Sequence, residues 1–231
     1  MKAKPMLKYC ISLFLVLSAL ALSAQEPIQD TLVIKHKYGL RIGFDMYGPI
    51  QNAITPKRKS YEVVADYRLS YRLFIAAEMG NTDNLTKVDY MQFNTTGNYI
   101  KAGVDYNSYN NWLGMDNMIY FGARIGYSNF SQELLSYTIN ANPFFDEIPI
   151  DTPQKFDNLT AKWFEIVFGI KAETLNNLYL GFSFRSKFLI SADEPTNFKN
   201  LYIPGFDRVF LNDTGFGFNY TLSYLIPFKK K

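Results

Sequence analysis

Cysteine and histidine are nearly missing from this 231-residue chain, which has one of each. Cys10 lies in the first apolar stretch, so the remaining residues can form neither a disulfide nor a thiolate site. His36 stands alone, without the paired histidines of a zinc motif or the serine-centred motif of a hydrolase. We therefore expect no metal, no cofactor and no enzymatic activity.

Strong net charge and long apolar runs are also missing. The net charge is +3, which gives no reason to expect a nucleic-acid partner. Mean hydropathy is -0.12, too polar for a helical membrane protein. Beyond residue 24 there is no run of about 18 apolar residues, so the sequence predicts no transmembrane helix.

The N-terminus has the three parts of a secretory signal. Lysines in MKAKPMLKYC precede the apolar run ISLFLVLSALAL, and small residues then lead to the polar QEPIQD. This order predicts a cleaved signal peptide at residues 1–24, with a cut after Ala21 as the alternative site. A membrane anchor is the competing interpretation, but the run is short for about 30 Å of hydrocarbon.

Apolar and polar residues alternate with period two in eight segments, which predicts strands with two different faces. These segments are 38–47, 61–71, 72–80, 99–107, 118–128, 162–172, 178–188 and 215–228. Each has about the ten residues that a tilted strand needs to cross a bilayer. Short links alternate with the long connections 48–60, 81–98, 129–161 and 189–212. We therefore predict an all-β fold, an antiparallel up-and-down transmembrane barrel of eight strands with periplasmic turns and long extracellular loops.

The predicted barrel occupies residues 38–228, between a flexible periplasmic segment at 25–37 and a basic tail at 229–231. VDYMQF (88–93) and LLSYTI (134–139) also alternate. They either lengthen strands above the membrane or cross it as two further strands of a ten-stranded barrel.

Alternation alone does not say which face is inside, since a soluble barrel is apolar inside and a membrane barrel is the reverse. The polar face here is rich in glycine, which leaves room for long charged side chains in a narrow interior. Its charges are nearly balanced, as a closed interior requires. We expect a plugged interior with this charge network: Arg41, Asp45, Glu62, Asp66, Arg68, Glu78, Lys101, Asp105, Arg124, Glu165, Lys171, Arg185 and Lys187.

The last strand, YTLSYLIPF, resembles the C-terminal signal of outer-membrane barrels, which the assembly machinery reads. The matching positions are Tyr220, Leu222, Tyr224, Ile226 and Phe228. Pro227 and the trailing lysines 229–231 depart from that signal. With LSAQ and YIKAGVDYN, the chain resembles a family of small, porin-like outer-membrane barrels of unknown function from Bacteroidota. The resemblance implies the outer membrane of a Gram-negative bacterium and no established activity.

The long loops carry aromatic residues that either form a partner surface or pack on one another. We name Phe144, Phe145, Tyr202 and Phe206 as the candidate partner surface. Residues 56–59 are basic, so they either contact the phosphates of lipopolysaccharide or are simply exposed to solvent. The expected function is a membrane anchor or accessory subunit for another envelope protein, such as a surface lipoprotein or a larger assembly or secretion machine. A narrow pore is the alternative, and a lipid-modifying enzyme is a weaker one.

Overall fold

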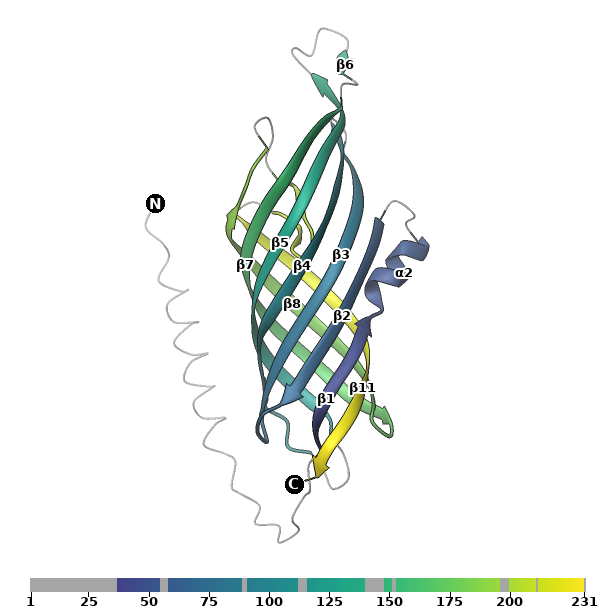
Figure 1. Ribbon diagram of the computed structural model, residues 1–231, viewed down its shortest axis with the longest axis vertical. Coiled ribbons are helices and arrows are strands. Elements are labelled where there is room, and N and C mark those ends of the chain that lie inside the picture. Colours follow the sequence, from purple (N-terminus) through teal and green to yellow (C-terminus); the bar gives the residue numbers. More distant parts are fainter. Residues whose placement is uncertain are drawn as a thin grey trace, which may run out of the picture. The chain divides into compact units, whose positions relative to one another are not determined.

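Eight long strands form the structure, a computed structural model (Figure 1). It describes residues 37–54, 58–88, 91–111, 116–139, 148–150, 153–195, 200–210 and 212–230. The long strands are β1 (Lys37–Asp45), β2 (Arg58–Arg68), β3 (Leu73–Val88), β4 (Met91–Asn107), β5 (Met118–Ile139), β7 (Gln154–Leu175), β8 (Leu178–Ala192) and β11 (Thr214–Lys230). The predicted signal peptide and residues 25–36 lie outside the described residues.

Antiparallel pairing closes these eight strands into a ring. Each long strand pairs with the long strands before and after it, including β4 with β5. The first and last strands close the ring, with Leu40 opposite Ile226 and Ile42 opposite Tyr224. A closed ring leaves no free sheet edge along its paired length. The predicted all-β barrel fold and its eight strands are confirmed.

Four short elements accompany the ring: α2 (Tyr47–Ile54), β6 (Ile148–Ile150), β9 (Tyr202–Ile203) and β10 (Asp207–Arg208). Strand β6 pairs with the far end of β5, while β9 and β10 form a separate small hairpin. No helix in the described ranges is long and apolar enough to cross a membrane.

Long strands on one side make the wall uneven. Of the segments at 88–93 and 134–139, the described residues (88, 91–93 and 134–139) lengthen β3, β4 and β5 and do not add two strands to the ring. Residues 81–88 and 91–98, which we predicted as a long connection, are therefore strand. Figure 1 shows β3, β4, β5 and β7 rising well beyond β1 and β2.

The outward face of the ring is apolar and the inward face is polar. On β4, Ile100, Val104 and Tyr106 are exposed, whereas Lys101 and Asp105 are buried. This is the reverse of a soluble barrel and the arrangement of a membrane barrel. We call the band of exposed apolar side chains around the ring the apolar belt.

The upper edge of the apolar belt is a row of polar residues that pair across the strands. Asn81 lies opposite Asn98, and Asn98 lies opposite Asn129. The Asn81 amide donates a hydrogen bond of 2.8 Å to Oδ1 of Asn98. In the row below, Met79 lies opposite Ile100. The change from apolar to amide side chains at one level is what a bilayer boundary requires.

Strand β11 continues beyond the predicted barrel end at residue 228. Lys229 and Lys230 pair with β1, so the predicted tail at 229–231 begins inside the strand, and Lys37 is strand as well. Pro227, which cannot donate to a ladder, lies opposite Gly39 beside an irregularity in the register. A Cβ on Gly39 would lie 2.1 Å from the Ile226 carbonyl oxygen. Glycine therefore lets the two strands approach closely where proline interrupts the ladder.

Candidate functional site

The interior of the barrel contains all thirteen charged side chains of the predicted network, and each of them is buried. They come from seven of the eight long strands, all except β11, because each strand turns its polar face inward. The structure adds Arg58, Asp116 and Asp207 to these ion pairs. With Arg58, the seven predicted bases become eight. With Asp116 and Asp207, the six predicted acids also become eight, so the charges of this network of described residues balance.

Glu78 on β3 is the hub of the network. Its carboxylate oxygens lie 3.0 Å from Lys101 Nζ, 3.3 Å from Arg124 Nε and 2.5 Å from Arg185 Nη1. Arg124 also meets Asp105 at 2.8 Å. Strands on opposite sides of the ring are therefore joined through one carboxylate.

Glu62 and Glu165 each bind one of the cations that also bind Glu78. Glu62 accepts hydrogen bonds from Lys101 at 2.7 Å, from the Tyr99 hydroxyl at 2.8 Å and from the Asn219 amide at 2.7 Å. Glu165 lies 3.2 Å from Arg185 Nη1. Glu165 also accepts a hydrogen bond from Trp163 Nε1 at 2.7 Å, so both of these buried carboxylates have their oxygens paired inside the barrel.

A second cluster fills the end of the barrel near the short turns. Asp66 binds Arg41 at 2.7 Å and Lys171 at 2.5 Å. Arg68 pairs with Asp116, which lies in the short link between β4 and β5. Period-two alternation did not predict Asp116, because the residue lies outside any strand.

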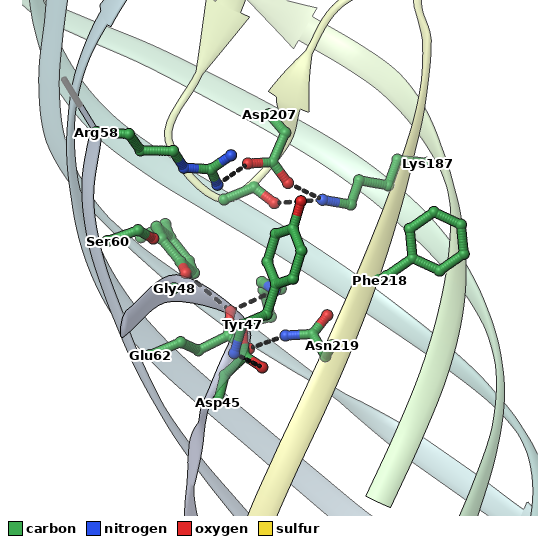
Figure 2. Close-up of a pocket in the computed structure, with 13 residues that line it drawn as sticks. Asp45, Tyr47, Gly48, Arg58, Ser60, Glu62, Lys187, Asp207, Phe218 and Asn219 are labelled. Atoms are coloured by element: carbon green, nitrogen blue, oxygen red, sulfur yellow. Dashed lines mark hydrogen bonds and ion pairs between the residues drawn. The ribbon is translucent and has the colours of Figure 1, made fainter. Parts of the chain in front are cut away.

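Residues 200–210, between β8 and β11, fold into the barrel and fill its other end (Figure 2). Lys187 Nζ lies 2.8 Å from Asp207 and donates to the Gly205 carbonyl at 2.9 Å. Arg58 reaches the other oxygen of Asp207 at 2.8 Å. Gly205 and Asp207 have φ of 80° and 70°, so the hairpin turns sharply. We call residues 200–210 the inner hairpin.

Electrostatics fix the inner hairpin in place. Burial disfavours the charged form of Asp207, but the cations of Lys187 and Arg58 outweigh it and hold the pKa of that carboxyl well below its usual range. Arg58 belongs to the basic stretch 56–59, whose role we predicted as lipopolysaccharide contact or solvation. Its ion pair with Asp207 makes it a structural residue.

Two residues of the candidate partner surface are not on the surface. Phe206 is 0% exposed and Tyr202 is 6% exposed. The Phe206 ring meets Trp163 edge-on, with centroids 6.0 Å apart. Tyr202 packs with Phe93 inside the lengthened strands. The prediction of an exposed partner surface is wrong for these two, because the inner hairpin buries them. Phe144 and Phe145 lie outside the described residues.

Little open space remains between these side chains. A cavity bordered by Asp45, Tyr47, Ser60, Glu62 and Asp207 has a volume of about 20 Å³, room for about one water molecule. A cavity near Arg41 and Arg68 has about 10 Å³. No group of three or more possible metal ligands occurs in the described parts of the chain.

The residues of the expected assembly signal lie on the outer face of β11. Tyr220, Tyr224, Ile226 and Phe228 are exposed, and Leu222 is half-buried. Farther up β11, Phe218 stacks on Phe182 of β8, with ring centroids 6.1 Å apart. The terminal strand therefore adds an aromatic surface to the apolar belt.

Comparison with known proteins gives a family but no activity. No curated protein matches the sequence. Among solved structures, the chain is similar to Ail, the attachment invasion locus protein of Yersinia pestis, with a TM-score of 0.40 and 8% identity over 82% of this chain and 97% of that one. A family model described as a domain of unknown function, DUF6048, matches residues 6–231. The chain therefore belongs to the DUF6048 family.

Proposed function

We propose that this protein is a non-conducting barrel of the outer membrane of a Gram-negative bacterium, and that it anchors or assists another envelope protein without acting as an enzyme. The apolar belt supports the membrane location, because exposed side chains such as Ile100, Ile125 and Phe121 suit lipid and not water. Outer-membrane lipids and lipopolysaccharide are then its surroundings, and barrel-assembly machinery inserts it.

The filled interior favours the proposal of an anchor over that of a pore. The Glu78 hub crosses the ring, and the inner hairpin fills the space above it. The two cavities of about 20 Å³ and 10 Å³ among the described side chains are each too small for a solute, which supports a closed interior. Opening a path would separate buried ion pairs, which costs several kcal/mol for each uncompensated charge.

The surface offered to a partner is the wall formed by β3, β4, β5 and β7 above the apolar belt. Its outer face is polar and ordered by its own hydrogen bonds. Asp83 accepts from the Asn94 amide at 3.0 Å and from the Thr96 hydroxyl at 3.1 Å. Such a preorganised sheet suits a folded envelope protein or a surface lipoprotein, since little ordering is needed on binding.

Crosslinking in native outer membranes tests the anchor proposal. A photoreactive residue at Thr96 samples the upper wall, and one at Val104 on the same strand samples the apolar belt. Mass spectrometry should find a protein adduct at Thr96 and lipid adducts at Val104. A chain that is extracted only as a monomer, with no protein adduct at Thr96, would contradict the anchor role.

Conductance of the purified protein in planar bilayers tests the closed interior. We expect no channel activity in the parent chain. Steady single-channel steps from a preparation free of porins would contradict the closed interior and support the narrow pore as the function.

A further inference from the structure

Strand β1 ends well before its two neighbours. Its last paired residues are Phe44, opposite Val63 of β2, and Asp45, opposite Thr221 of β11. Strand β2 extends from there to Arg58, and β11 extends to Thr214. Above β1 the wall therefore lacks one strand. Within the described residues, no strand pairs with β2 or β11 on this side.

Helix α2 occupies the missing position, and its attachment is polar. The Asn52 side chain accepts a hydrogen bond from the Ser60 N–H at 3.0 Å and donates to the Ser60 carbonyl at 3.4 Å. One amide side chain thus pairs with both backbone groups that a neighbouring strand would bind. Gly48 lies so close that an added Cβ would be 2.3 Å from the Ser60 oxygen. Figure 1 shows α2 beside β2, following directly on β1.

The free face of α2 is apolar. Ile50 and Ile54, one helical turn apart, are 46% and 71% exposed, and Ala53 between them is also exposed. Gly48 and Asn52 lie on the opposite face, against Ser60. A surface helix in water shows the reverse, with polar residues outward and apolar residues inward. Helix α2 has the same inverted polarity as the barrel wall.

The exposed face of α2 is continuous with the apolar belt. Phe44, at the end of β1, and Tyr61, next to Ser60, are both exposed members of the belt. Tyr61 lies opposite Asn81, which belongs to the polar row at the belt's upper edge. Helix α2 therefore lies at the level where the bilayer core meets the headgroups, a depth at which amphipathic helices bind.

We propose that α2 is an interfacial helix that seals the gap above β1 and inserts Ile50 and Ile54 into the outer leaflet. This inference rests on the proposed membrane location. Unpaired backbone groups are costly in lipid, so a wall with one strand missing needs such a cover. Asn52 satisfies the backbone groups of Ser60 at the exposed edge of β2, and the two isoleucines meet the lipid.

Spin-label accessibility in phospholipid vesicles tests the proposal. Single cysteines replace Ile54, Ile100 and Lys155 in a Cys10→Ser background. Ile100 is the lipid control in the apolar belt, and Lys155, 61% exposed at its side chain, is the water control. Collisions with oxygen report lipid, and collisions with a nickel chelate report water. We expect the label at Ile54 to match that at Ile100, with the ratio shifted toward oxygen relative to Lys155.

The two controls separate the possible failures. If Ile100 collides with oxygen and Ile54 with nickel, α2 faces water and the inference fails while the membrane location stands. If the label at Ile54 meets neither reagent, protein covers the helix and the lipid assignment fails. If Ile100 also meets nickel, the membrane location itself fails. Ile50→Cys provides a second label on the same face should Ile54→Cys prevent folding.

Discussion

Replacing Glu78 with glutamine tests the closed interior most directly. The change keeps the shape of the side chain and removes its charge, which three cations share at 2.5 to 3.3 Å. Each cation keeps one acid: Lys101 keeps Glu62, Arg124 keeps Asp105 and Arg185 keeps Glu165. The balance of eight bases and eight acids nevertheless becomes eight and seven, with one buried positive charge uncompensated.

Breaking a buried ion pair by removing one partner typically costs about 3–5 kcal/mol. We expect Glu78→Gln to lower the free energy of unfolding by that amount. Adding Arg185→Gln restores the charge balance, so the double variant should lose less than the sum of the two single changes. A coupling energy of about 0.5–3 kcal/mol is the usual range for residues in contact.

Urea unfolding in phospholipid vesicles, followed by Trp fluorescence, measures these differences. Asp157→Asn is the matched control, because its ion pair with Lys155 at 3.0 Å is exposed on both sides. Pairs of that kind contribute about 0.2–1 kcal/mol. If Glu78→Gln costs no more than this control and shows no coupling to Arg185→Gln, the interior is hydrated and the closed barrel is wrong.

Three further changes probe the packing of the interior. Phe206→Ala should cost about 3–5 kcal/mol in unfolding free energy, because it leaves a cavity beside Trp163, whereas Phe228→Ala in the apolar belt should cost far less. Gly126→Val should lower the free energy of unfolding by about 1–3 kcal/mol, because a Cβ would lie 2.1 Å from Cε2 of Trp163. An unchanged unfolding midpoint would contradict this tight packing and show that the indole ring of Trp163 can move. Because the folded pKa of Asp207 is lowered, its stabilisation is complete above its ordinary pKa of about 4 and is lost as the pH falls below it. The free energy of unfolding should therefore fall as the pH is lowered below about 4, and Asp207→Asn should remove part of that fall.

Period-two patterning was enough to place the eight long strands and their faces, but not the extensions of β3 and β4. Charges on one side of seven of the eight segments predicted the buried positions of Glu78, Arg185 and the rest of the network, because orientation along a strand is a local property. The closing strand was predicted for the same reason. The pairing partners were not predicted, because the cations that meet Glu78 lie on three other strands, up to 107 residues away in sequence.

The inner hairpin and α2 could not be read from the sequence. Tyr202 and Phe206 suit an exposed loop and a buried one equally, and only contact with Phe93 and Trp163 decides between them. Helix α2 has eight residues, too few for a clear helical period, and it includes Gly48 and Pro49. Its polarity is also inverted, so the usual search for an inward apolar face would reject it.

Ion pairs across the ring have a consequence for assembly. Asp66 and Lys171 are 105 residues apart in sequence, and Glu78 and Arg185 are 107 apart. Neither pair can form before both halves of the chain share one ring. A slip of one residue in any strand that carries network charges would turn those charges to the outer face of the barrel. The interior ion pairs therefore form only when the strands pair in the correct register. Contacts that form after the folding transition state slow unfolding more than they speed folding. A finished barrel should be slow to come apart, which suits the proposed role of an anchor.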